Sequence, residues 1–206
     1  MKTHLISAGD LQVSLQPEKD GLLLRAVTDK KSGARFLRGG QHSLFTLTAR
    51  EKGTENYVCV NSQSGWGAVS AGSGANVHTF TFAGHKDLNG VTVILSAAAA
   101  GNDSISWTVR LYSENEQYAL YECDYPALSF NACSKTKVFF PYGCGETYNS
   151  VRTFETKQNY PSYGASMQYM ALWHEGAGRG IYYGLHDPAP AYKKLFYKKA
   201  RAKSLP

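Results

Sequence analysis

The sequence of 206 residues contains no apolar run of membrane-spanning length, and its N-terminus lacks the hydrophobic stretch and cleavage pattern of an export signal. It has only four cysteines: Cys59, Cys123, Cys133 and Cys144. Their spacing fits neither CxxC metal knuckles nor a dense disulfide framework. We therefore expect free thiols in a soluble, cytoplasmic protein with no membrane partner.

Several catalytic motifs are also missing. The sequence has no GxSxG nucleophile elbow, no HExxH zinc motif and no GxxxxGK[ST] or GxGxxG phosphate-binding loop. His174 and Glu175 begin an HExxH string, but no second histidine follows. We predict no catalytic residue, no metal site and no cofactor.

The formal charge of +6 is confined to the C-terminal end of the sequence. Six basic residues and no acidic residue follow Pro188, and the other 16 basic residues balance the 16 acidic ones. The segment from Tyr192 to Lys203 mixes lysines with aromatic residues, which would suit a polyanion or an edge strand protected by charge. Because the rest of the chain is neutral, we favour the edge strand and expect no nucleic-acid partner.

Sustained helical periodicity is absent, whereas short segments that alternate apolar and polar residues recur between glycine-rich and polar turns. This pattern predicts a single all-β domain over residues 1–206, with two packed antiparallel sheets and few or no helices. Asn89-Gly90 predicts a hairpin turn, and four glycines within residues 65–74 predict a loop or an irregular edge. The expected strands are 11–15, 22–28, 34–37, 43–49, 57–60, 77–83, 91–97, 105–112, 118–123, 126–130, 137–140, 151–156 and two strands within 160–197 that are joined by a glycine-rich turn. Polar residues 29–33 predict the turn after strand 22–28, and within strand 105–112 the alternation predicts Ile105, Trp107 and Val109 on the core face.

Aromatic and polar side chains near strand ends are the best candidates for a binding site. Sugar C–H faces pack on flat rings, and sugar hydroxyls need amide, carboxylate or imidazole partners. His186 and Asp187 stand at a strand end directly before Pro188, a position poorly suited to core packing. The candidates for carbohydrate binding or a domain interface are Trp66, Tyr163, Gln168, Trp173, His174, His186 and Asp187.

The strings YPS-ASMQYMALW and GIYYGLHDP-KKLFY within residues 160–197 resemble the N-terminal β-sandwich of a bacterial glycoside-hydrolase-like family, described as a domain of unknown function. In that family the sandwich precedes a (β/α)8 barrel. Earlier strings, among them GLLLRAVTDKKSGARFL and VFFPYGCGE, are similar to galactose-mutarotase-like supersandwiches. The residues that match the late strings are Tyr160, Pro161, Met167, Gln168, Tyr182, Gly184, His186 and Asp187.

This resemblance implies an accessory, carbohydrate-associated sandwich that packs on a C-terminal catalytic barrel and lends a loop to its sugar site. The sequence stops at Pro206, before any barrel, so the resemblance carries over no catalytic residue. One alternative is an aldose epimerase of the mutarotase type, with a histidine acid and Glu122 or Glu146 as base. The other is polyanion binding through the basic C-terminal segment.

Overall fold

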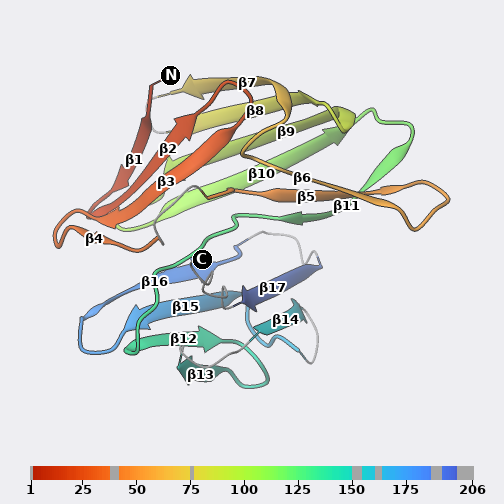
Figure 1. Ribbon diagram of the computed structural model, residues 1–206. Coiled ribbons are helices and arrows are strands. Elements are labelled where there is room, and N and C mark those ends of the chain that lie inside the picture. Colours follow the sequence, from red (N-terminus) through yellow and green to blue (C-terminus); the bar gives the residue numbers. More distant parts are fainter. Residues whose placement is uncertain are drawn as a thin grey trace, which may run out of the picture. The chain divides into compact units, whose positions relative to one another are not determined.

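The computed structural model describes residues 2–37, 42–74, 77–149, 155–160, 164–186 and 192–198. The chain divides into two compact units, unit 1 over residues 1–131 and unit 2 over residues 132–206. All strand pairs are antiparallel, and the described residues form no helix (Figure 1). The all-β, antiparallel prediction is therefore confirmed. Over the same residues there is accordingly no helix able to cross a membrane.

Unit 1 contains three sheets, with strand orders β1-β2-β3-β4, β10-β9-β8-β7 and β11-β5-β6. Strand β1 packs against the second sheet, since its His4 ring lies 5.2 Å from the Phe80 ring of β8. The strands are β1 (His4–Ala8), β2 (Leu11–Pro17), β3 (Leu22–Asp29), β4 (Ala34–Arg35), β5 (Thr46–Glu51), β6 (Tyr57–Asn61), β7 (Trp66–Ser73), β8 (Val77–His85), β9 (Leu88–Ala99), β10 (Ile105–Ser113) and β11 (Tyr118–Asp124).

Unit 2 contains two sheets, with strand orders β13-β12-β15-β16 and β14-β17. The β15–β16 hairpin turns over residues 175–178, so the predicted glycine-rich turn between two late strands is confirmed. The strands are β12 (Thr136–Phe140), β13 (Glu146–Asn149), β14 (Glu155–Tyr160), β15 (Tyr169–His174), β16 (Arg179–Gly184) and β17 (Lys193–Lys198).

Within the described residues the strands thus fall into five small sheets, whereas the sequence predicted two packed ones. Alternation along a strand reports which face is buried, but it does not report which strands are neighbours. In strand β10 the alternation predicts the buried face but does not identify the neighbouring strand. Ile105, Trp107 and Val109 are partly buried and the residues between them are exposed, as predicted, yet only the register shows that β9 is the partner.

Aromatic rings form the centre of the core in unit 1. Phe45, Trp66 and Phe82 are each at most 2% exposed and meet edge to face, with centroid separations of 5.2 to 5.9 Å. Each ring comes from a different part of the chain, so these contacts join the β5–β6 sheet region to the β7–β10 sheet. Edge-to-face contacts of this kind add to the hydrophobic stabilisation of burial.

One buried hydroxyl, that of Ser62, ties three segments of unit 1 together. Ser62 is 0% exposed, and its Oγ accepts a hydrogen bond from the Leu44 amide at 2.8 Å and donates to the Leu22 carbonyl at 3.1 Å. The Leu22 amide in turn donates to the Ser62 carbonyl at 2.6 Å, and the Ser62 amide donates to the Phe45 carbonyl at 3.2 Å. The start of β3, the end of β6 and the segment before β5 are therefore fixed against one another.

Two local predictions were wrong, the Asn89-Gly90 turn and the strand over residues 126–130. His85 pairs with Leu88, so the β8–β9 turn lies at residues 86–87 instead of Asn89-Gly90. Gly90 does have a positive φ of 76°, but it lies inside β9. The glycine-rich segment forms β7, an edge strand of its sheet, in line with the edge alternative, and residues 126–130 form no strand. The predicted strand 151–156 lies mostly outside the described residues.

Candidate functional site

The four-stranded sheet of unit 2 has one face that forms a core. Val138, Phe140 and Leu172 project from this face and are 2%, 0% and 7% exposed. Phe140 packs with Leu195 of β17 and with Tyr160 of β14. Because side chains alternate along each strand, the residues between these positions lie on the opposite face, which we call the outer face.

The outer face carries a continuous row of rings from three strands and the segment after them. Phe139 of β12 and Tyr169 of β15 are stacked with centroids 5.2 Å apart, and Tyr169 lies 5.3 Å from Tyr182 of β16. Tyr182 stacks in turn on His186 at 5.9 Å, and its hydroxyl lies 3.2 Å from the His186 Nε2. We call these four residues the aromatic row. Tyr182 is 56% exposed and His186 is exposed, so this end of the row is open to solvent.

Two glycines of β16 make room for this arrangement. A Cβ atom on Gly184 would lie 2.4 Å from the His186 Nε2 and 2.5 Å from the Tyr182 hydroxyl. A Cβ atom on Gly180 would lie 2.6 Å from both the Leu172 carbonyl oxygen and the Trp173 Cβ. Larger residues at these positions would displace the rings, so the sequence of β16 is adapted to an aromatic outer face.

Polar side chains border the aromatic row on the same sheet. Lys137, which is opposite Trp173 in the register, donates from its Nζ to the Asn149 Oδ1 at 2.8 Å. The same Nζ lies 3.4 Å from a Glu175 carboxylate oxygen. An amide, an ammonium and a carboxylate on a sheet that also carries aromatic rings are groups that can recognise sugar hydroxyls.

The structure separates the residues predicted for a site. Trp173 lies on the outer face and His186 ends the aromatic row, whereas His174 projects from the core-forming face and hydrogen-bonds Thr136. Gln168 lies just before β15, and its Oε1 is buried with no hydrogen-bond partner. Tyr163 and Asp187 lie outside the described residues.

Trp66 was predicted as a candidate for carbohydrate binding, and this prediction is wrong because the ring belongs to the core of unit 1. It is 2% exposed, and its indole nitrogen donates to the Asn61 carbonyl at 2.8 Å. A ring enclosed by Phe45, Phe82 and His85 offers no face to a ligand from solvent. The sequence pattern of an aromatic residue between glycines did not distinguish an enclosed ring from an open one.

Phe139 and Tyr169 of the aromatic row were not among the predicted site residues. Each lies in an ordinary alternating strand, and they are 30 positions apart in the sequence. They become neighbours because Phe139 is opposite Ala171, two positions after Tyr169 on the same face. Phe139 shares its strand face with Lys137, which is a weak sequence signal for an outer position. Tyr169 alternates with Ala171 and Trp173, so its strand gives no polar signal.

A second cluster in unit 2 joins a thiol to an imidazole. Cys133 is exposed, and its Sγ lies 3.6 Å from the His174 Nδ1 and 3.6 Å from the Thr136 Oγ1. The Thr136 Oγ1 also lies 2.9 Å from the His174 Nδ1. These three side chains meet where the start of β12 pairs with the end of β15.

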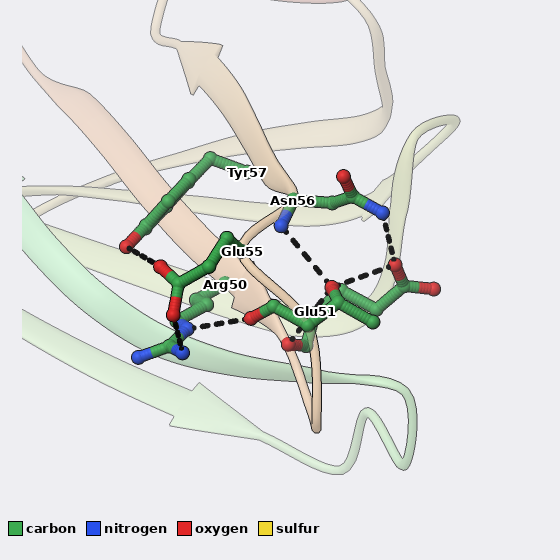
Figure 2. Close-up of polar contacts among 6 residues, drawn as sticks. Arg50, Glu51, Glu55, Asn56 and Tyr57 are labelled. Carbon is green, nitrogen blue, oxygen red and sulfur yellow. Dashed lines mark hydrogen bonds and ion pairs between the residues drawn. The ribbon is translucent and has the colours of Figure 1, made fainter.

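The tip of the β5–β6 hairpin gathers several charged groups, but they satisfy one another (Figure 2). Arg50 pairs with Glu55 and donates to the Thr54 carbonyl at 2.8 Å. The Glu51 carboxylate accepts from Asn56 at 2.8 Å, and hydrogen bonds from Asn56, Gln117 and Thr54 hold its pKa below the usual value. Such a cluster stabilises a turn and leaves no carboxylate free to act as an acid or base.

The epimerase alternative needs a histidine acid that faces a carboxylate base. His85 is 4% exposed, its Nδ1 accepts from the Asp87 amide at 3.1 Å, and burial lowers its pKa. Glu146 in unit 2 accepts a hydrogen bond from the Tyr148 hydroxyl. Within the described residues no group of three or more His, Cys, Asp or Glu side chains could hold a metal ion.

Unit 1 also has an open depression of about 210 Å³ next to β11. Its walls are polar and apolar in nearly equal measure, and the thiol of Cys123 within it has a pKa raised to about 12 by burial. It is lined by Leu47, Leu111, Leu120, Tyr121, Glu122 and Cys123. A shallow depression without convergent polar groups does not define a binding site.

Comparison of the chain with protein-family models, curated proteins and solved structures gives no match. Any functional conclusion therefore rests on the chemistry of the chain itself.

Proposed function

We propose that this protein is a non-catalytic, carbohydrate-binding β domain of a glycoside hydrolase, and that the outer face of the unit 2 sheet contacts the sugar. The aromatic row is the observation that carries this proposal. A row of rings that ends in an exposed tyrosine and histidine suits the mixed apolar and hydroxyl surface of a carbohydrate.

The polar border of the row supports the same ligand class. Lys137, Asn149 and Glu175 provide donors and acceptors on the same sheet as the rings, and one hydrogen bond and one ion pair orient them. A flat ring offers contact area with little loss of conformational entropy on binding, and fixed polar groups then give specificity. Trp173 on the same face extends the apolar surface.

The place of the domain in a larger enzyme is also part of the proposal. The strings in residues 160–197 support an accessory role beside a (β/α)8 barrel, which would be its partner. Three residues of the aromatic row, Tyr169, Tyr182 and His186, lie within those strings. On this proposal the domain belongs to the galactose-mutarotase-like sandwiches and acts in the cytoplasm. The barrel supplies the carboxylates that cleave the glycosidic bond.

Affinity electrophoresis tests the binding. The chain is run in gels that contain a soluble β-glucan, a xylan or a galactomannan, and we expect retardation by at least one of them. Tyr182→Ala should weaken the retardation about tenfold, since loss of an exposed ring contact costs roughly 1.4 kcal/mol.

Tyr112→Ala is the matched control, because Tyr112 is 52% exposed on β10 of unit 1 and is remote in sequence from the row. This variant should migrate like the unmodified chain. Equal weakening by both substitutions, or no retardation in any gel, would contradict the proposal. The same preparations should release no chromophore from aryl glycosides, because no hydrolytic carboxylate pair is assigned to the domain.

A further inference from the structure

The Cys133, His174 and Thr136 cluster has a geometry that the carbohydrate proposal does not use. Thr136 is 0% exposed, and its Oγ1 accepts a hydrogen bond from the Cys133 amide at 2.8 Å. The Thr136 amide donates back to the Cys133 carbonyl at 3.0 Å, which closes a tight turn. The buried hydroxyl is therefore fixed in position, and the exposed sulfur is held next to it.

The hydrogen-bond directions favour a thiolate at this sulfur. Because the Thr136 oxygen already accepts from the Cys133 amide, its proton is free to point to the Sγ at 3.6 Å. A proton on the His174 Nδ1 can then be donated to the Thr136 Oγ1 at 2.9 Å or to the Sγ at 3.6 Å. The Thr136 hydroxyl, and the His174 Nδ1 proton when it points to the Sγ, thus stabilise negative charge on sulfur.

Charge and hydrogen bonding act in the same direction on the thiol. The Thr136 hydroxyl contributes most to lowering the pKa of Cys133, followed by the backbone amide of Lys135. The Thr136 amide and the positive charge of Lys135 lower it further. Burial acts in the opposite direction, but the side chain is exposed and this effect is outweighed.

We propose that Cys133 is a reactive thiol that undergoes exchange with low-molecular-weight disulfides, with His174 and Thr136 as its activating partners. The Cys133 proton moves to the His174 Nδ1, and the thiolate attacks one sulfur of the disulfide. The sulfur–sulfur bond of the small molecule breaks, and a new one joins Cys133 to one half. The other half leaves as a thiolate and takes the proton from the imidazolium, so that atoms and electrons balance.

The other cysteines provide internal comparisons. Cys59 and Cys144 are exposed as well, and Cys59 even has a hydroxyl neighbour, since the Thr48 Oγ1 lies 3.9 Å from its Sγ. In the described part of the chain, a contact with a histidine ring is seen only for Cys133. Cys123 is the opposite extreme, because burial raises its pKa to about 12. Exposure alone should therefore not make a thiol fast in this protein.

Single-thiol variants test the proposal. Three proteins retain only Cys133, only Cys59 or only Cys144, with the remaining cysteines replaced by serine. Their rates of reaction with dithiobis-nitrobenzoate are followed by absorbance, and their reaction with cystamine by intact mass. At about pH 6.5 we expect Cys133 to react roughly tenfold faster than Cys59 or Cys144. The rate of each thiol rises with pH as the thiolate forms, and we expect the rate of Cys133 to reach its plateau at a lower pH than the other two.

His174→Gln in the Cys133-only protein separates activation from exposure. This substitution should remove most of the rate advantage of Cys133 over the other thiols and move its rate profile to higher pH. The circular dichroism spectrum and the retardation in polysaccharide gels should stay unchanged. A Cys133 rate and pH profile equal to those of Cys59 and Cys144 would overturn the proposal. So would a fast Cys133 that is unaffected by His174→Gln and by Thr136→Val, because the activating partners would then be wrong.

Discussion

The two units use aromatic residues in opposite ways. In unit 1, Phe45, Trp66 and Phe82 meet edge to face and are at most 2% exposed. In unit 2, Phe139 stacks on Tyr169 and Tyr182 follows at a tilt of 32° on the outer face of a sheet, and Tyr182 is 56% exposed. The contrast shows that ring type does not decide whether a ring is buried or exposed here. What distinguishes the two sets is whether a second layer covers the rings.

The largest effect expected from this contrast is on stability. Trp66→Ala should lower the free energy of unfolding of unit 1 by about 3–5 kcal/mol, because it removes a buried ring and the partner of Asn61. Tyr182→Ala should cost less than about 1 kcal/mol, because its ring is half exposed. Urea denaturation followed by circular dichroism measures both. Similar costs for the two substitutions would remove the distinction between core and surface rings.

A smaller effect is expected at the glycine beneath Trp173. Gly180→Ala should destabilise unit 2 by roughly 1–3 kcal/mol, because its Cβ would meet the Leu172 carbonyl at 2.6 Å and must shift the backbone or Trp173. Gly72→Ala in β7 is the control, since a Cβ there meets nothing within 4 Å. The control should be neutral or slightly stabilising in thermal denaturation. If Gly180→Ala leaves the stability of unit 2 unchanged, the backbone or Trp173 can shift at no measurable cost.

The smallest expected effect is the loss of stability of unit 1 at acidic pH. Burial is the main cause that lowers the pKa of His85 and of His4, and the nearby charges of His78 and Lys2 also lower that of His4. The unfolded chain then binds protons below about pH 6.5 that the folded unit does not bind. The stability of unit 1 is therefore complete above that pH and is lost progressively as the pH falls below it.

Urea midpoints of unit 1 measured at neutral and at mildly acidic pH check this sign. The tryptophans Trp66 and Trp107 report on unit 1 by fluorescence, although Trp173 of unit 2 contributes to the total signal. His4→Gln should reduce the acid sensitivity, because it removes one of the two groups and the His78 contact at 3.2 Å. A midpoint that rises on acidification would contradict the assigned direction.

The sequence was informative about strands and poor at predicting their partners. Alternation gave the two faces of β10, and polar turn residues gave the β3–β4 connection, where Asp29 pairs with Ala34. Both signals are local, since each depends on a residue and its near neighbours. The five-sheet arrangement depends on contacts between distant strands, and no local pattern reports these.

The candidate site shows the same limit at the level of single residues. His186 was singled out because of its place at a strand end, and it does end the aromatic row. Phe139 and Tyr169 could not be singled out, because only the register of β12 and β15 makes them neighbours. His174 and Cys133 are likewise 41 positions apart, and their contact follows from the pairing of Thr136 with His174.

The buried hydroxyl of Ser62 has a consequence for how unit 1 opens. Its bonds to Leu22 and Leu44 span 40 and 18 residues, so breaking them exposes polar groups from segments on both sides of the core at once. No single sheet of this region can detach while the others keep their buried hydrogen bonds satisfied. Partial opening is thereby penalised, and the amides of Leu22 and Leu44 should exchange with solvent deuterium together, in one cooperative event.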